Sequence, residues 1–220
     1  MKYDLIIVSK STPELKKFTL QTIATALQDK ADVNVIIVET SGKKVDYPGA
    51  EIIMYKGQFN YNRALNLGLT KAKGDIHILA NSDLVFCKGW SQIGEQMLIN
   101  GFDSASALSE DRRQSVFKRG DIIYPGYEIG TYLTGWCLFV TKECIKKLGK
   151  LDETFEFWYS DNVYADQLQA NNLRHGLFCN VQVNHVTSVT VRTAPAADQR
   201  RYTREATTRY SKLKKLRNVG

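Results

Sequence analysis

The chain has 220 residues, of which 43% are hydrophobic and 24% charged, and its formal net charge is +7. These values fit one soluble globular domain with a substantial core, and no apolar run approaches the roughly 18 residues that span a membrane. The four cysteines form no Cys-x-x-Cys pair and the first residues show no signal-peptide pattern, so we expect an intracellular, cytoplasmic protein without a disulfide framework or a zinc site.

Strand and helix patterns alternate through the first 80 residues. Apolar runs of strand length lie at residues 3–8, 33–38, 51–55 and 76–80. Thr12 and Asn60 are the expected N-caps of the helices that follow the first and third runs, and Pro13 fits the first position of the earlier helix. Alternating elements, with strands apolar on both faces, predict an α/β fold with a mostly parallel sheet flanked by helices.

Two common phosphate-binding motifs are absent. The sequence contains neither Gly-x-Gly-x-x-Gly nor Gly-x-x-x-x-Gly-Lys followed by Ser or Thr. Glycine loops of these kinds let the backbone approach a dinucleotide or a nucleoside triphosphate, so we expect neither a dinucleotide cofactor nor a P-loop nucleotide hydrolase.

The most informative stretch is residues 75–86, where an apolar strand ends in Asn81-Ser82-Asp83 and the chain then continues as Leu-Val-Phe. In an open α/β sheet, ligands bind beyond the carboxyl ends of the strands. A carboxylate there, two positions after a short polar residue, suits a divalent cation and a diphosphate, because Mg²⁺ is held by one or two carboxylates plus phosphate oxygens. The alternative is an Asx turn in which Asn81 and Asp83 cap the helix expected from Trp90.

The second half of the chain has a less regular pattern. Helices are expected at residues 90–99, 143–148 and 163–171, and strands at 104–108, 132–141 and 176–185. Residues 111–127 are polar, basic and punctuated by glycine, which is typical of a loop or hairpin over a site. Four aromatic residues between Phe155 and Tyr159 precede Asp161, and the last strand ends at His185.

Taken in this order, the segments resemble the nucleotide-sugar-dependent glycosyltransferases with the GT-A fold, particularly the inverting family-2 type. The matching motifs are Thr-Pro-Glu-Leu at 12–15, Val-Ile-Ile-Val-Glu at 35–39, Asn-Arg-Ala-Leu-Asn at 62–66, Asn-Ser-Asp at 81–83 and Gly-Lys-Leu-Asp-Glu-Thr-Phe at 149–155. The resemblance extends over residues 3–190. Asn81 stands where the family's Asp-x-Asp metal motif begins with Asp, and Ser160 stands where the family has Glu before Asp161.

The resemblance implies a GT-A-like, Rossmann-related domain over residues 1–191 that uses a UDP-linked sugar donor and a divalent cation, Mn²⁺ or Mg²⁺. It assigns Asp83 and His185 as metal ligands, since a bound cation stabilises the leaving diphosphate. It assigns Asp161 as the base that deprotonates the acceptor hydroxyl. It implies a nucleotide-sugar site formed by Ser9, Glu39, Asn62, Arg63, Asn81, Asp83 and Trp136.

Several of these residues also have a structural interpretation. Glu39 suits a capping or surface carboxylate, His185 a structural histidine, and Asp161 the N-cap of the helix that follows it. Trp136, Trp158 and Tyr159 are expected to form an acceptor platform, because aromatic faces stack on sugars and bases, and the alternative for each is a place in the core.

The excess positive charge is concentrated at the C-terminal end. Residues 192–220 hold nine basic and two acidic residues, whereas residues 1–191 hold 21 of each. Tyr202, Ala206 and Tyr210 fall on one face of an expected basic C-terminal helix. The basic residues expected to contact a nucleic-acid backbone are Arg201, Arg204, Arg209, Lys212 and Lys215. The alternatives are a docked helix with a solvated basic face and a helix on an acidic membrane surface.

The acceptor is inferred from a further resemblance. Small GT-A-like enzymes of bacteriophages, which glycosylate hydroxymethylated pyrimidines in DNA, are similar to this chain in size, solubility and basic character. We therefore expect a phage DNA-modifying glycosyltransferase that acts in the host cytoplasm, with DNA as its acceptor. A surface or capsular saccharide is the alternative acceptor, and a non-catalytic nucleic-acid-binding module on a degenerate transferase fold is the alternative function.

Overall fold

The computed structural model describes residues 1–186 and 196–217, except the side chains of Asp198, Leu216 and Arg217. The strands in these residues are β1 (Lys2–Ser9), β2 (Asp32–Glu39), β3 (Ala50–Met54), β4 (Ile76–Asn81), β5 (Leu84–Phe86), β6 (Ser104–Leu108), β7 (Ile123–Pro125), β8 (Cys137–Thr141) and β9 (His175–His185). The α-helices are α1 (Pro13–Ala26), α2 (Tyr61–Leu69), α3 (Gln92–Asn100), α4 (Lys142–Leu148), α5 (Ser160–Ala170), α7 (Ala196–Arg200) and α8 (Ala206–Arg217). Two shorter helical segments are the 3-10 turn η1 (Arg112–Gln114) and the π-helical turn η2 (Arg201–Glu205).

The nine strands of the described part form one sheet in the order β3-β2-β1-β4-β8-β6-β9-β5, and β7 pairs with β9 beside this path. β3, β2, β1 and β4 are mutually parallel, as the alternating strand and helix pattern predicts. β8 is antiparallel to β4 and β6, whereas β9 is parallel to β6 and antiparallel to β5 and β7. The prediction of a mostly parallel sheet therefore holds for the first four neighbouring strands, and the other half of the sheet is mixed.

The mixed half of the sheet follows from the path of residues 109–136. This segment leaves the carboxyl end of β6, pairs with β9 as β7, and returns to the same edge at Thr134, whose N–H donates to Ser106 Oγ at 2.9 Å. Because β8 starts from the edge at which β6 ended, it runs in the opposite direction. The carboxyl ends of β1, β2, β4, β6 and β9 and the start of β8 therefore share one edge of the sheet.

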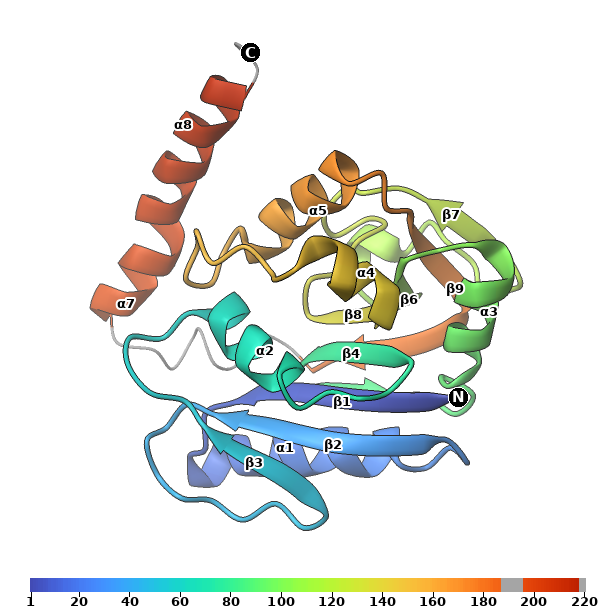
Figure 1. Cartoon of the computed structure of the whole chain (residues 1–220), viewed down its shortest axis with the longest axis horizontal. Coiled ribbons are helices and arrows are strands. Elements are labelled where there is room, and N and C mark those ends of the chain that lie inside the picture. The colour runs from blue at the N-terminus through green and yellow to red at the C-terminus, as the bar shows by residue number, and fades with distance from the viewer. Residues whose placement is uncertain (187–195, 218–220) are drawn as a thin grey trace.

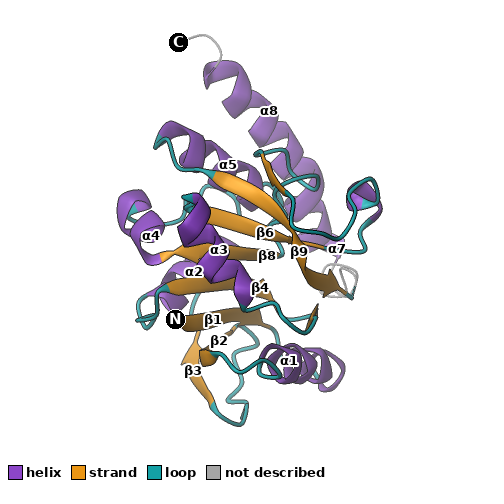
Figure 2. Cartoon of the chain, turned by 90° about the vertical axis from the view of Figure 1, so that its right-hand side faces the viewer, coloured by secondary structure: helices purple, strands orange, loops and turns teal. Residues whose placement is uncertain are grey.

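Helices cover both faces of the sheet (Figures 1 and 2). α1 and α3 pack on one face, where Ile23 and Met97 belong to the same buried cluster as Leu5 of β1. α2, α4 and α5 pack on the other face, where Leu65 belongs to the same buried cluster as Ile6. Neighbouring residues of β1 thus alternate between two cores, as expected for a strand that is buried on both faces.

The sequence signals at the first two helices are confirmed. Thr12 caps α1 at 3.1 Å and Asn60 caps α2 at 2.9 Å, each through a side-chain oxygen that accepts the backbone N–H three residues later. The strand expected at residues 132–141 begins only at Cys137. The Cys137 N–H donates to the Thr134 carbonyl at 3.1 Å, and this bond closes a turn immediately before the strand.

The interpretation in which Asn81 and Asp83 cap the next helix is wrong. α3 begins at Gln92, and its N-cap, Ser91, makes no side-chain capping bond. Asp29 takes the place of a cap, because its Oδ2 accepts the Ser91 N–H at 3.1 Å. Asn81 and Asp83 therefore have no capping role and remain at the carboxyl edge of the sheet.

The tail forms one continuous helix from α7 through η2 to α8, and this helix packs against the body of the protein. Tyr202 packs edge-on against Phe59, with ring centroids 6.2 Å apart, and Tyr210 stacks on Tyr159 at 4.6 Å. The C-terminal end of α8 extends beyond the body in both views (Figures 1 and 2). None of the described helices combines the length and the apolar character of a membrane-spanning segment.

Candidate functional site

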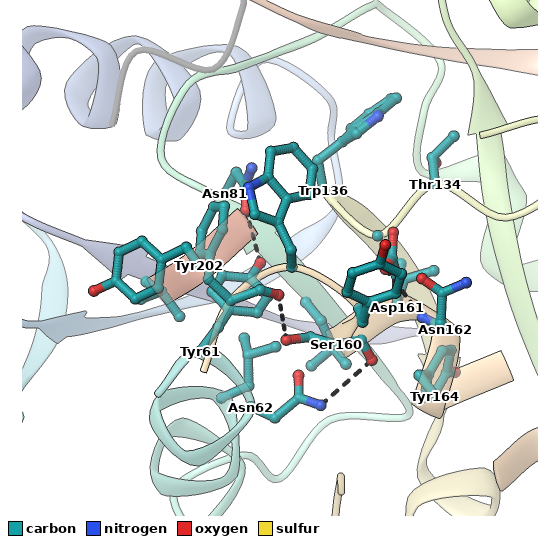
Figure 3. Close-up of a pocket in the computed structure, with 18 of the residues that line it drawn as sticks. Tyr61, Asn62, Asn81, Thr134, Trp136, Ser160, Asp161, Asn162, Tyr164 and Tyr202 are labelled. Carbon is teal, nitrogen blue, oxygen red and sulfur yellow. Dashed lines mark hydrogen bonds between the residues drawn. The ribbon is translucent and has the colours of Figure 1, made fainter. Parts of the chain in front are cut away.

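A cavity of about 810 Å³ opens at the edge where the strand ends meet. Its walls come from the ends of β1, β4 and β9, the loops before β8 and α5, and the part of the tail helix formed by η2 and the start of α8. Figure 3 shows Tyr61, Trp136, Asp161 and Tyr202 around the same space. Small-molecule and cofactor sites typically have volumes of roughly 300–1,000 Å³, so the cavity is large enough for a ligand of that size.

Asp83 and His185 meet at the polar end of the cavity. Asp83 Oδ1 lies 3.0 Å from His185 Nε2, because β5, which directly follows Asp83, pairs with the end of β9. Asp83 is 6% exposed, and the His185 ring stacks on Trp136 with centroids 5.5 Å apart and planes at 13°. The structure therefore brings together the two residues that were predicted as metal ligands.

The donor atoms at this point fit a divalent cation that is shared with a diphosphate. Imidazole and carboxylate groups are both common ligands of transition-metal ions, and Mg²⁺ is commonly held by one or two carboxylates plus phosphate oxygens. Residues 1–186 and 196–217 contain no group of three or more His, Cys, Asp or Glu residues that could hold a metal ion. Asp83 and His185 would therefore be the protein ligands, and a diphosphate and water would complete the coordination.

Asn81 is oriented by its neighbours at the same end of the cavity. Its Oδ1 accepts the Tyr61 hydroxyl at 2.8 Å, and its Nδ2 lies 3.5 Å from His185 Nε2. With the carbonyl oxygen accepting from Tyr61, the NH₂ group of the amide can serve as a hydrogen-bond donor in the cavity. This arrangement is compatible with the predicted place of Asn81 in a nucleotide-sugar site.

Asp161 lies in the first turn of α5, on the other side of Trp136 from Asn81 in Figure 3. The N-cap of this helix is Tyr159, so the interpretation of Asp161 as the cap is wrong. Burial raises the pKa of Asp161, and the positive charge of Arg113 offsets part of the rise. A buried carboxyl group with a raised pKa, placed in a cavity, binds a proton more readily than an ordinary carboxylate and is a candidate general base.

Gly135 makes room for Asp161. A Cβ added at Gly135 would lie 2.5 Å from the Asp161 Cβ and 2.9 Å from its Oδ2, which is closer than real Cβ contacts come. Gly135 and Trp136 are consecutive, so the same short segment touches Asp161 on one side and stacks on His185 on the other. This segment joins the candidate base and the candidate metal ligands into one site.

Aromatic side chains from three parts of the chain form a further wall. Phe157 packs against Tyr61 and Tyr202, with ring centroids 6.0 Å and 5.8 Å apart. Trp158 and Tyr159 also line the cavity, and Trp158 remains 41% exposed. The predicted acceptor platform thus lies at the cavity, and the tail helix is part of the same wall.

The remaining residues predicted to bind the nucleotide sugar divide into two groups. Ser9 and Asn62 line the cavity, although the Asn62 amide donates to a backbone carbonyl at 2.6 Å. Glu39 and Arg63 lie outside the cavity lining. The Glu39 carboxylate is buried and accepts the backbone N–H groups of the loops after β1 and β2, and Arg63 pairs with Glu153 at 2.9 Å. The structure therefore gives these two side chains partners within the protein.

Other cavity residues carry no recognisable motif in the sequence. Arg113 lies in η1 and Asp111 is the N-cap of that turn, and Asp111 Oδ1 accepts the Arg113 Nε–H at 3.2 Å. Thr134 is 2% exposed, and its Oγ1 has no hydrogen-bond partner among the described residues. All three belong to the long segment between β6 and β8. The polar and basic character of residues 111–127 predicted a loop over the site. No periodic pattern in the segment shows which of its side chains point inward.

The basic residues of the tail also divide into two groups. Arg201 lines the cavity, and its Nε lies 2.6 Å from Glu156 Oε2. The others are exposed and form what we call the basic face of the tail: Arg204, Arg209, Lys212 and Lys215. Arg201 therefore belongs to the contact between tail and body. The basic face is exposed, although the Arg209 guanidinium also lies over the Phe155 ring, 5.7 Å from its centroid.

Comparison of the sequence with models of protein families gives no match, and comparison with curated proteins gives none. The fold has counterparts among solved structures. A crystal structure of GalNAc-T7 with UDP, GalNAc and Mn²⁺ superposes with a TM-score of 0.65 at 11% sequence identity. The match covers 84% of this chain and 44% of that chain, so this protein spans less than half of its structural neighbour. The predicted GT-A-like α/β fold is confirmed.

Proposed function

We propose that this protein, with its GT-A-like fold, is a nucleotide-sugar-dependent glycosyltransferase that uses a UDP-linked donor and a divalent cation. The observation that carries the proposal is a cavity in which Asp83 and His185 meet and which also holds the buried carboxyl group of Asp161. A leaving diphosphate needs charge neutralisation and an acceptor hydroxyl needs a base, and this site supplies both. The fold shared with GalNAc-T7, crystallised with UDP, GalNAc and Mn²⁺, supports this class of donor.

The polar end of the cavity is the proposed donor site. Asp83 and His185 would hold Mn²⁺ or Mg²⁺, which when bound supplies Lewis-acid stabilisation of the leaving diphosphate. The Tyr61 hydroxyl orients the Asn81 amide so that its N–H groups can donate to the diphosphate. The Trp136 ring fixes the plane of the His185 imidazole by stacking. These contacts would order the site before a donor arrives.

The proposed transfer is a single displacement. The acceptor hydroxyl gives its proton to the Asp161 carboxylate as its oxygen bonds to the anomeric carbon, while the bond from that carbon to the phosphate oxygen breaks and its electron pair passes to the diphosphate. Attack opposite the leaving group inverts the configuration. Burial raises the pKa of Asp161, which strengthens its carboxylate as a base.

The proposed acceptor is DNA that carries a hydroxymethylated pyrimidine. An aromatic wall with an exposed Trp158 suits stacking on a planar base. α8, which carries three of the four residues of the basic face, extends outward from the body (Figure 1). Its exposed basic residues suit the phosphates of a polymer whose target unit enters the cavity. A saccharide is the second candidate acceptor, favoured by the same Trp158, because sugar rings also stack on indole.

A non-catalytic nucleic-acid-binding module is the competing function. Asn81, an amide where an acid would strengthen a metal site, favours it. Binding and turnover of a UDP-sugar distinguish the two functions. A glycosyltransferase requires both, whereas a non-catalytic module needs neither UDP-sugar nor cation.

Thermal unfolding and UDP-sugar hydrolysis in the presence of Mn²⁺ test the donor site. A donor at 100 times its Kd should stabilise the folded protein by about 2.7 kcal/mol, and EDTA should remove that effect. Asp83→Asn should abolish metal-dependent binding and turnover, because Asp83 is one of two protein ligands. Asp46→Asn, which changes an exposed carboxylate outside the cavity, should leave both unchanged.

Two outcomes would count against this assignment. Full activity of Asp83→Asn, or activity that survives EDTA in the unaltered protein, would remove the cation from the donor site. If no UDP-sugar binds or is hydrolysed in a broad screen, the transferase proposal is wrong and the nucleic-acid-binding module takes its place.

A further inference from the structure

Tyr159 has an unfavourable backbone conformation immediately before the helix that carries Asp161. Its φ is +70°, in the left-handed region that side chains with a Cβ rarely adopt. It is the N-cap of α5 but makes no side-chain capping bond, so capping does not explain the conformation. Such conformations persist only where the surrounding contacts hold them, and they cluster at functional sites.

Contacts from the tail helix hold Tyr159. Its ring stacks on that of Tyr210, with centroids 4.6 Å apart and planes at 22°. Its hydroxyl donates to Thr207 Oγ1 at 3.0 Å. Thr207 and Tyr210 are three residues apart on α8 and so lie on the same face of the helix. Phe155 packs on both tyrosine rings, at 5.8 Å from Tyr159 and 5.9 Å from Tyr210.

A second contact fixes the tail to the same loop. Arg201 Nε lies 2.6 Å from Glu156 Oε2, and the other oxygen of Glu156 accepts the Gln58 amide at 2.7 Å. Glu156 and Tyr159 both belong to the loop before α5. The tail helix therefore contacts this loop at two points, through the Arg201–Glu156 ion pair and through the stacked rings of Tyr210 and Tyr159.

Asp161 follows Tyr159 by two residues and has little freedom of its own. It lies in the first turn of α5, and its side chain packs directly on Gly135. Its carboxyl interacts electrostatically with Arg113 of η1 and Tyr61 of α2, both in the cavity lining. A change in the backbone at Tyr159 would rotate the first turn of α5 and move the carboxyl relative to these groups.

We propose that the tail helix positions the catalytic base: Tyr210 stacks on Tyr159 and holds the left-handed turn that directs Asp161 into the cavity. The inference rests on the proposed function, because it takes Asp161 as the base. It gives the tail a role in the chemistry of the body, separate from any contact between its basic face and an acceptor. Tyr210 is thus a positioning residue that does not need to touch the substrate.

The test compares Tyr210→Ala and Tyr210→Phe with the matched control Ser211→Ala, an exposed neighbour on α8. The first readout is a ¹³C NMR titration of the Asp161 carboxyl, assigned with Asp161→Asn, in the full chain without substrate. Burial raises the pKa of Asp161, so loosening the turn in Tyr210→Ala should lower it toward its ordinary value. Tyr210→Phe, which keeps the stacked ring, and Ser211→Ala should titrate like the unaltered protein.

The second readout is turnover. Tyr210→Ala should lower kcat by about 10- to 100-fold, the effect of a misplaced reacting group, with the Kd for UDP unchanged. Tyr210→Phe should restore kcat. If Tyr210→Ala does not fold, Thr207→Val keeps the stacked rings and removes the hydroxyl contact with Tyr159, together with the bond from Thr207 Oγ1 to the Thr203 carbonyl within the helix. It should shift the titration in the same direction by less.

The outcomes separate this inference from the proposed function. An Asp161 titration that is the same in Tyr210→Ala or Thr207→Val as in the unaltered protein would overturn the positioning role. A titration that depends on Tyr210, in a protein that neither hydrolyses nor transfers from any UDP-sugar, would support the positioning role and refute the transferase.

Discussion

Replacing Asp161 with Asn should slow the reaction and leave donor binding intact. The amide has the size of the carboxyl group but cannot accept a proton from the acceptor hydroxyl. We expect turnover to fall by about 10²–10⁴, the range typical of a lost general base. Steady-state kinetics give kcat, and calorimetric titration with UDP and Mn²⁺ gives the Kd, which should stay unchanged. A variant that loses donor affinity and keeps kcat would place Asp161 in the donor site instead.

The same variant should change how stability depends on pH. Burial raises the pKa of Asp161, so the folded protein holds this proton more tightly than the unfolded chain does. The stabilisation from this group is then fully present below the ordinary carboxyl pKa of about 3.9 and is lost as pH rises through the raised value. Asp161→Asn should therefore unfold like the unaltered protein in acid and be more stable than it at neutral pH. Urea unfolding at several pH values measures the difference, and a difference independent of pH would contradict it.

The residues that sequence could locate are those fixed to the ends of regular elements. Asp83 follows a short apolar strand, His185 ends the last strand, and Asp161 opens a helix, so the edge of an α/β sheet collects all three. Arg113 and Thr134 belong to the long segment between β6 and β8, where the inward direction of a side chain depends on the tertiary path. The sequence also does not show which groups donate hydrogen bonds to a buried carboxylate. Glu39 ends a strand as predicted, yet it lies outside the cavity lining and accepts the backbone N–H groups of Ser11 and Ser41.

At the scale of elements, α2 is tied to the segment before α5 by side-chain amides. Asn60 and Asn62 donate to backbone carbonyls of residues 151–153 at 2.9 Å and 2.6 Å. Asn66 exchanges two hydrogen bonds with the backbone of Leu151, each of 2.9 Å. The Asn-Arg-Ala-Leu-Asn motif therefore positions the start of the loop that leads to Tyr159 and the candidate base.

Asn66→Ala should lower the free energy of unfolding by about 1–3 kcal/mol, because it leaves the N–H and the carbonyl of Leu151 without their partner. The Kd for UDP should not change, since Asn66 lies outside the cavity lining. Urea unfolding measures the loss of stability. In the matched control, Asn100→Ala, an exposed amide on α3 loses a single bond within its own helix, and a change of about 0.5 kcal/mol or less is expected. Lost donor affinity at unchanged stability would instead assign the motif to the nucleotide.

The arrangement of elements was predictable where neighbouring segments of the chain are also neighbours in space. The parallel order of β1, β2, β3 and β4 follows from apolar strands joined by amphipathic connections. The antiparallel direction of β8 does not follow from this pattern, because residues 109–136 return to the edge of the sheet at which β6 ended. The docking of the tail could be proposed from its apolar stripe, but the loop that it contacts depends on long-range ring contacts such as Tyr202 with Phe59.

At the scale of the whole molecule, the excess charge lies in the C-terminal residues 192–220. Residues 1–191 carry equal numbers of basic and acidic groups, and the net charge of +7 belongs to residues 192–220. Arg201 is engaged with Glu156, so the basic face of the tail is the part available to an anionic polymer. The aromatic residues of the helix contact the site, and the residues of its basic face are exposed. Arg209 belongs to both surfaces, because its guanidinium also lies over the Phe155 ring.

If the acceptor is DNA, the basic face should bind its phosphates. Replacing Arg204, Arg209, Lys212 and Lys215 with Gln should flatten the slope of log binding constant against log salt by about 0.9 for each phosphate that the protein no longer neutralises. KM for DNA should rise, whereas UDP-sugar hydrolysis should be unchanged, because these four side chains lie outside the cavity. The matched control replaces four exposed lysines of the body with Gln and removes the same charge: Lys30, Lys43, Lys44 and Lys150.

Binding and transfer at two or more salt concentrations decide between the acceptors. A slope that flattens in the tail variant and not in the body variant assigns phosphate binding to the tail, because both variants lower the net charge of +7 by four. Equal slopes in the two variants would show a non-specific charge effect and remove the basic face from recognition. Transfer to an oligosaccharide, with none to DNA bearing hydroxymethylated bases across the common UDP-sugars, would replace DNA by a saccharide as acceptor. It would leave the donor site and Asp161 in their proposed roles, since neither depends on what the basic face binds.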